Sequence, residues 1–216
     1  MERTAILFDY WRSSASYRVR IALNLLSIPI EYRPVNLLTG DHRSAAYLDE
    51  NPQGLLPTLE IDGKRLTQSL AIIEYLHATT PGSKLLPDSI DGQYRIRQLS
   101  DAIAMEIHPV CNLSVAQRVV DLTGGGNEVR VDWMRHFISK GLGAFERLLG
   151  AGEGPFCLGD QPTMADCCLV PQLYNAERWG VDTSGFRRIG EAANAANTMN
   201  AFVDAHPDAV GAPPAE

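Results

Sequence analysis

Positive charge is in short supply in this chain. Its 26 aspartate and glutamate residues outnumber 19 lysine and arginine residues, and the formal net charge is −7. Binding to nucleic-acid phosphates requires a basic surface, so we expect no nucleic-acid partner. The exception is local, because Arg12, Arg18 and Arg20 lie close together in the sequence and favour a small anionic ligand there.

Long hydrophobic runs and clustered cysteines are also missing. No apolar stretch approaches the ~20 residues of a membrane span, and the N-terminus lacks a basic start followed by an apolar core. None of the 4 cysteines belongs to a C-x-x-C pair, and adjacent Cys167 and Cys168 suit neither an ordinary disulfide nor a zinc site. We therefore expect buried, reduced thiols in a cytoplasmic protein without a membrane segment.

Several catalytic motifs are absent as well. The chain has no G-x-S-x-G, no P-loop and no G-x-G-x-x-G, so hydrolase, NTPase and dinucleotide-binding functions lose their usual support. The 5 histidines show no metal-ligand spacing, and we expect no metal site. His108 is the histidine that we place near a cavity, because His108-Pro109 interrupts a helical pattern.

What the chain does contain is an alternation of strand and helix patterns within residues 1–82. Ala5–Phe8 and Ile30–Val35 are strand-like, and a helical period begins at Ser14. Pro29 excludes any continuation of that helix. Two strands joined by a helix predict a βαβ unit with parallel strands and a right-handed crossover.

A hairpin and a last helix complete the predicted N-terminal domain. Leu56–Ile61 and Lys64–Leu66 flank Asp62-Gly63, a pair typical of a two-residue turn. A helix is predicted from Ser69 to Ala78, and the weakly patterned stretch Leu37–Glu50 has room for a short helix. The expected order is β-α-β-(α)-β-β-α.

The remaining residues, 83–216, predict an all-helical domain. Thr79–Ser83 is the expected boundary, and no convincing strand follows it. Residues 93–119 and 129–150 read as two long helices. The fold class is therefore an α/β domain followed by an all-α domain.

Smaller features mark the C-terminal part of the chain. A third helix begins at Thr163, where Asp166 completes a capping box. We expect Pro171 to bend that helix and the tail from Ala209 to fray.

Three short segments could carry chemistry. Ser13–Arg18 opens a helix, where unpaired N–H groups and the helix dipole stabilise an anion such as a thiolate, although plain N-capping explains the serines equally. Gln68-Ser69 is either a cap or an anchor for a carboxylate and an amine. A cis bond before Pro57 would turn the Leu56 N–H and C=O outward to pair with a peptide ligand, although most X-Pro bonds are trans.

In combination these segments resemble zeta-class glutathione transferases. The resemblance covers nearly the whole chain and is carried, in the family's order, by Trp11–Leu23, Asn51–Leu59, Gln68–Leu76, Asn112–Val115, Thr163–Asp166, and Leu169–Gln172 followed by Asn175–Arg178. It implies a thioredoxin-like N-terminal domain, an all-helical C-terminal domain, bound glutathione and a homodimer. The activity implied is glutathione-dependent isomerisation of maleylacetoacetate, a small dicarboxylic enedione, to fumarylacetoacetate.

The resemblance also implies a set of site residues. Ser13 and Ser14 are the implied catalytic residues, next to the glutathione thiolate. Arg12 and Arg178 are the implied binding residues for the substrate carboxylates. The glutathione-binding residues carried over are Ser13, Ser14, Ala15, Ser16, Tyr17, Arg18, His42, Leu56, Pro57, Gln68, Ser69, His108, Asn112, Leu113 and Ser114.

One residue departs from the family pattern. Ala15 stands where the family often has cysteine. The implied chemistry requires no protein thiol, because the sulfur that adds to the double bond belongs to glutathione. Tyr10 is a rival hydroxyl, since other classes use a tyrosine at the end of the first strand.

Two other functions stay open. One is a maleylpyruvate isomerase or a general glutathione transferase; the neutral stretch Asn112–Val115 favours maleylacetoacetate over maleylpyruvate. The other is a non-catalytic binding module on the same fold, against which the intact Ser13-Ser14, Pro57 and Gln68-Ser69 argue.

Overall fold

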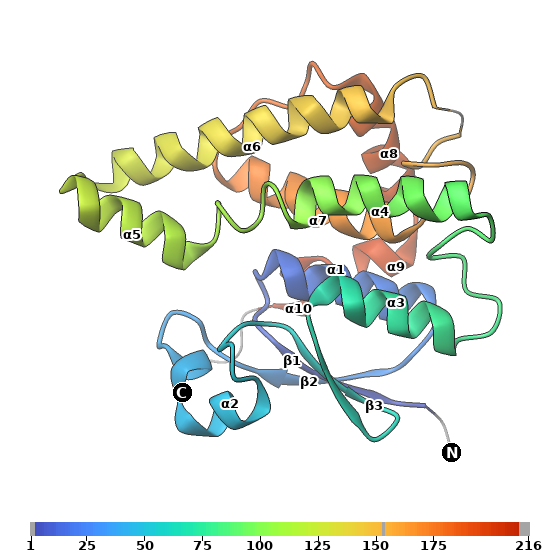
Figure 1. Cartoon of the computed structure of the whole chain (residues 1–216), viewed down its shortest axis with the longest axis horizontal. Coiled ribbons are helices and arrows are strands. Elements are labelled where there is room, and N and C mark those ends of the chain that lie inside the picture. Colours follow the sequence, from blue (N-terminus) through green and yellow to red (C-terminus); the bar gives the residue numbers. More distant parts are fainter. Residues whose placement is uncertain (1–2, 153, 212–216) are drawn as a thin grey trace. The chain divides into compact units, whose positions relative to one another are not determined.

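The computed structural model describes residues 3–152 and 154–211, which fall into two compact units (Figure 1). Unit 1 comprises the chain up to Leu86 together with the segment from Asn197 onward, and unit 2 is Pro87–Ala196. The domains expected from the sequence, 1–82 and 83–216, differ from these units, because the C-terminal segment packs against a helix of unit 1.

Unit 1 is built on a four-stranded sheet. Its strands are β1 (Ala5–Asp9), β2 (Ile30–Pro34), β3 (Thr58–Ile61) and β4 (Lys64–Thr67), in the order β2-β1-β3-β4. β1 pairs in parallel with β2, while β3 is antiparallel to both β1 and β4. The predicted βαβ unit and hairpin are confirmed. Asp62 and Gly63 both have positive φ, 53° and 70°, as a tight hairpin turn of this kind requires.

Helices cover both faces of this sheet. Figure 1 shows α1 (Ser14–Leu25) and α3 (Ser69–Thr79) on one side and α2 (Ala45–Glu50) on the other, after a 3-10 turn at Asp41–Arg43. Burial alternates along β1 because successive side chains face opposite sides. The Phe8 ring lies 6.0 Å from that of Tyr47 in α2, which fixes α2 on the Phe8 side.

The C-terminal segment of unit 1 contains two short helices, α9 (Asn200–Val203) and α10 (Pro207–Val210). Its backbone carbonyls accept hydrogen bonds from three side chains of α1: Asn24 to Ala201, Tyr17 to Phe202 and Arg20 to Ala205. Ala209 therefore lies in a helix, contrary to the expectation that fraying starts there. The last part of that tail, 212–216, lies outside the described residues.

Unit 2 is helical throughout its described part. Its helices are α4 (Ile90–Ala104), α5 (Leu113–Thr123), α6 (Asn127–Leu149), α7 (Met164–Arg178) and α8 (Arg187–Asn197). The predicted single helix over 93–119 is wrong, because α4 ends at Ala104. Pro109 offers no backbone N–H and disfavours helical geometry at His108, so a new helix starts only after Asn112. No helix in the described ranges is long and apolar enough to cross a membrane.

The start of α7 confirms the predicted capping box. The Asp166 carboxylate is 1% exposed and accepts hydrogen bonds from the Thr163 N–H at 2.8 Å, the Thr163 hydroxyl at 2.9 Å and the Cys157 N–H at 2.8 Å. One buried side chain therefore caps α7 and ties the preceding loop to it.

Candidate active site

Ser13 is the N-cap of α1. Its backbone is extended, with φ −68° and ψ 116°, and its hydroxyl accepts a hydrogen bond from the Ser16 N–H at 3.2 Å. The capping role that the sequence left open is thus present. It does not exclude the anion-binding role, because the same hydroxyl lies beside the unpaired N–H groups of the first helical turn.

The next residues of α1 are buried. Ser14 and Ala15 lie at the first turn, while Ser16, Tyr17 and Arg18 are almost completely enclosed. Tyr17 donates its hydroxyl to the Phe202 carbonyl, at 3.4 Å. The side chain of Tyr17 therefore supports the fold of unit 1, and the least buried part of this segment is its N-terminal end.

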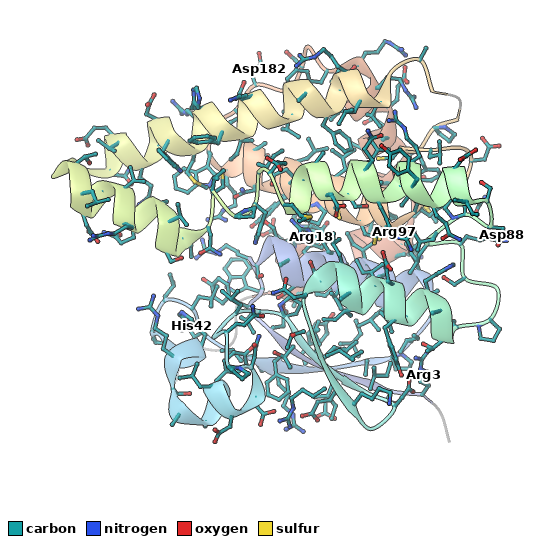
Figure 2. The ribbon with its side chains drawn as sticks, viewed as in Figure 1. Arg3, Arg18, His42, Asp88, Arg97 and Asp182 are labelled. Carbon is teal, nitrogen blue, oxygen red and sulfur yellow. The ribbon has the colours of Figure 1, made fainter. Side chains whose placement is uncertain are left out.

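Arg18 joins α1 to the start of α3 (Figure 2). Its guanidinium donates to the Ser69 hydroxyl at 3.2 Å, inside unit 1. Gln68, the N-cap of α3, has φ 68° and ψ 108°, a conformation that costs a residue with a side chain roughly 1–3 kcal/mol. Its exposed amide donates to Gln53 at 2.9 Å. Two helix starts of the predicted site are therefore physically connected.

The Leu56–Pro57 peptide bond is cis, the alternative that the sequence left open beside the commoner trans form. The loop before it is held from α2, because the Leu55 carbonyl accepts from the Tyr47 hydroxyl at 2.7 Å and the Asn51 amide at 2.8 Å. Within the described ranges, the Leu56 N–H and C=O have no hydrogen-bond partner. Both backbone groups are therefore available to pair with an extended peptide.

His42 lies in the 3-10 turn before α2 (Figure 2). Its Nδ1 is buried and has no partner among the described residues. Burial lowers the pKa of His42 below its ordinary value of 6.5, and the neighbouring Arg43 charge lowers it further, while Asp41 opposes the change. The imidazole is therefore neutral at pH 7 and can offer a neutral N–H to a ligand.

Arg12 is held by two aromatic neighbours. Its Nη2 donates to the Tyr10 hydroxyl at 3.2 Å, and its guanidinium carbon lies 4.6 Å from the centre of the Trp11 ring. Its Nε is buried without a partner in the described part of the chain. The rival hydroxyl of Tyr10 thus serves as a hydrogen-bond acceptor for Arg12.

The other candidate residues belong to unit 2. His108 lies half-buried between α4 and α5, and Arg178 is the exposed last residue of α7, 5.8 Å from the Tyr174 ring. Asn112 caps α5 by accepting from the Ser114 N–H and hydroxyl, and Leu113 is 51% exposed. The role of all five residues at a ligand stays a prediction.

Sequence reasoning missed the pair beneath this site. Asp9 at the end of β1 and Arg20 on α1 form a buried ion pair with an N–O distance of 2.9 Å. The sequence feature that could have revealed this pair is two opposite charges at positions where the strand and helix patterns predict buried apolar side chains. No group of metal-ligating side chains able to hold an ion occurs in the described ranges, where all four cysteines are buried and none forms a disulfide.

Comparison with known proteins places these features in a family. Residues 7–84 match the N-terminal domain model of glutathione S-transferases, and residues 138–204 match the C-terminal domain model. The chain is 54% identical to a maleylacetoacetate isomerase of Rhizobium meliloti over 209 residues, which cover 96% of this chain and 98% of that protein.

Solved structures agree with the sequence relatives. A holo maleylpyruvate isomerase, described as a bacterial zeta-class glutathione S-transferase, is 38% identical with a TM-score of 0.91, over 94% of this chain and 97% of its own. The maleylacetoacetate isomerase of Anaeromyxobacter dehalogenans, solved with glutathione in its active site, is 38% identical with a TM-score of 0.88, over 98% and 99%. The chain therefore belongs to the glutathione S-transferase family and, within it, to the zeta class.

Proposed function

We propose that this protein is a glutathione-dependent isomerase that converts maleylacetoacetate to fumarylacetoacetate. The observation that carries the proposal is the unpaired Leu56 backbone, beside which unit 1 also provides two connected helix starts. A free N–H and C=O on one residue pair with a peptide as a further strand would, which is the recognition that a tripeptide such as glutathione needs.

The residues of unit 1 suit the parts of glutathione in order. Gln68 and Ser69 receive the γ-glutamyl end, because the start of α3 favours a carboxylate. Leu56 pairs with the central peptide, and neutral His42 donates to the glycine carboxylate. Glutathione, when bound, supplies a sulfur nucleophile that adds reversibly to the conjugated double bond and permits rotation about it.

Ser13 has the task of keeping that sulfur ionised. Its hydroxyl can donate to a thiolate at the positive end of the α1 dipole, which favours the charged form. A decrease of the thiol pKa by about 1–2 units corresponds to ~1.4–2.7 kcal/mol. Ser14 lies in the first turn beside it, and positioning of the sulfur contributes as much or more.

Arg12 and Arg178 are the residues that we assign to the substrate carboxylates. Arg12 is favoured by its preset orientation, because the Tyr10 hydroxyl and the Trp11 ring fix the guanidinium while its Nε is unpaired. The Anaeromyxobacter relative, which was also solved with dicarboxyethyl glutathione and citrate in its active site, supports recognition of multiple carboxylates in this family.

Maleylpyruvate is the second candidate substrate. A maleylpyruvate isomerase matches with a TM-score of 0.91, but a maleylacetoacetate isomerase reaches the same value, so the fold does not discriminate between the two substrates. The neutral stretch Asn112–Val115 and the 54% identical relative favour maleylacetoacetate. We further propose that the protein is a cytoplasmic homodimer, in keeping with the absence of disulfides between its four buried cysteines and with the family resemblance.

The test compares the two diacids. The purified protein is incubated with glutathione and either maleylacetoacetate or maleylpyruvate, and conversion to the fumaryl isomer is followed by absorbance. We expect kcat/KM to be higher for maleylacetoacetate. Faster turnover of maleylpyruvate would reverse the substrate assignment, and turnover of neither diacid would refute the isomerase.

A further inference from the structure

Arg20 is a charged side chain in the core of unit 1. It is 0% exposed, and its partner Asp9 is 4% exposed. Arg20 Nη1 donates to both oxygens of the Asp9 carboxylate at 2.9 Å, while Nη2 and Nε donate to backbone carbonyls. Every nitrogen of the guanidinium thus has a partner, which is the condition under which a buried charge is tolerated.

The backbone bond made by Nη2 reaches the residues that precede α1. Its acceptor is the Trp11 carbonyl, at 3.0 Å, in the segment 10–13 that we call the site loop. The loop is also closed on itself, because the Ser13 N–H donates to the Tyr10 carbonyl at 2.7 Å. Arg20 therefore fixes the loop at the residue that directly precedes Arg12.

The third bond ties the C-terminal segment to the same guanidinium. Arg20 Nε donates to the Ala205 carbonyl at 3.0 Å, and the Tyr17 ring lies 5.1 Å from the guanidinium carbon. The end of β1, the site loop and residues 197–211 thus meet at one side chain. Arg20 is therefore a contact that the other two share with the loop that carries Arg12 and Ser13.

Stability alone does not explain such a pair. Replacing a buried ion pair by apolar side chains of similar volume is often neutral or stabilising, because desolvation offsets the attraction. What apolar side chains cannot supply is a directed hydrogen bond to the Trp11 carbonyl. The geometry therefore favours a role in orientation.

We propose that Asp9 and Arg20 are positioning residues, which hold the site loop so that the Ser13 hydroxyl and the Arg12 guanidinium face the thiolate and the substrate. The proposal rests on the proposed isomerase function for its kinetic consequence. Its consequence for the thiolate can be measured without any isomerisation.

The test replaces the pair by apolar residues in the double variant Asp9→Leu/Arg20→Met. We expect a folded protein by circular dichroism whose kcat is about 10- to 100-fold lower, because a misplaced reacting group loses rate on this scale. The KM for glutathione should change less than kcat. The pKa of the bound glutathione thiol, read from thiolate absorbance against pH, should rise toward that of free glutathione.

The matched control is Arg3→Met, at the opposite end of β1. Arg3 also pairs with a carboxylate in unit 1, that of Asp62 at 2.6 Å, and donates to Thr80 at 2.7 Å, but this pair is partly exposed and makes no bond to the site loop. We expect this variant to lose thermal stability. Its kcat should stay within about twofold of the wild-type value and its thiol pKa within about 0.3 units, and each of these limits corresponds to about 0.4 kcal/mol.

A double variant that is folded and retains the wild-type kcat and thiol pKa would overturn the proposal. If the double variant does not fold, Arg20→Lys is the deciding variant, because lysine keeps the charge beside Asp9 but cannot also reach the Trp11 carbonyl. Unchanged kcat and thiol pKa in Arg20→Lys would likewise overturn the proposal. If the wild type binds glutathione without isomerising, the proposed function fails and the thiol pKa alone decides the role of the pair.

Discussion

At the scale of single residues, Ser13 combines two tasks that substitutions can separate. Ser13→Ala removes both the cap of α1, worth about 1 kcal/mol, and the donor to the thiolate. Ser13→Asp keeps a capping oxygen for the Ser16 N–H but places a negative charge beside the sulfur. We expect both variants to lose at least ~10-fold in kcat, while only Ser13→Ala loses stability in urea denaturation.

The control for this comparison is Ser89→Ala. The Ser89 hydroxyl caps α4 by accepting from the Gly92 N–H at 3.1 Å, and it belongs to unit 2. Loss of stability with normal kcat is expected. If Ser13→Ala shows the same pattern as Ser89→Ala, Ser13 is a cap only.

The cysteines lead to a prediction about reactivity. Burial raises the pKa of the Cys111 thiol to about 11 and raises the pKa of Cys157 and of Cys167 well above the ordinary value. Thiolate is the reactive form, so its fraction at pH 8 is only about one in a thousand for Cys111 and grows as pH increases. Iodoacetamide at pH 8 should leave both the intact mass and the isomerase activity unchanged. Rapid inactivation accompanied by alkylation would show that a protein thiol participates despite Ala15.

Arg178 is the residue on which the substrate assignment in unit 2 depends. We expect Arg178→Ala to raise the KM for the diacid about 10-fold or more, because a charge-assisted pair with a carboxylate is lost, and to leave the KM for glutathione unchanged. Arg178→Lys should recover only part of the loss, since lysine cannot bind a carboxylate through two parallel bonds. Equal effects on both KM values would contradict the assignment.

At the scale of elements, the start of α7 depends on one buried carboxylate. Asp166→Ala leaves the N–H groups of Cys157 and Thr163 without their acceptor, in addition to removing the capping box. We expect a loss of at least about 2 kcal/mol in the free energy of unfolding, measured by urea denaturation. Asp182→Ala removes a similar but exposed bond, to the Ser184 N–H, and should cost no more than ~0.5 kcal/mol. Equal losses in the two variants would contradict this account of Asp166.

Elements with strong local signals could be predicted from the sequence. Pro29 ends the first helix pattern, Asp62-Gly63 specifies a tight turn, and Thr163 with Asp166 specifies a helix start, so each signal lies within a few residues. The interruption at His108-Pro109 was visible in the sequence, but residues 93–119 were still read as one helix, whereas α4 ends at Ala104 and α5 starts at Leu113. The short helices α9 and α10 were missed because side chains of α1 hold the segment that contains them, at Phe202 and Ala205, and such contacts leave no local pattern.

The site shows the same division between local and long-range information. Ser13, Leu56 and Gln68 could be selected from motifs, since each stands at a turn or helix start with a recognisable composition. The Asp9–Arg20 pair could not be selected in this way, because its role depends on the fold, which brings β1, the site loop and Ala205 within hydrogen-bond distance of one side chain. Positioning residues of this kind become visible only when the fold brings their partners together.

At the scale of the whole molecule, the central claim is that glutathione, and no group of the protein, supplies the nucleophile. The measurement is maleylacetoacetate isomerisation with glutathione, without it, and with the analogue in which 2-aminobutyrate replaces cysteine. We predict turnover with glutathione alone and competitive inhibition by the thiol-free analogue, which keeps every contact except the sulfur. Isomerisation that proceeds without glutathione, or that the analogue supports, would contradict the account.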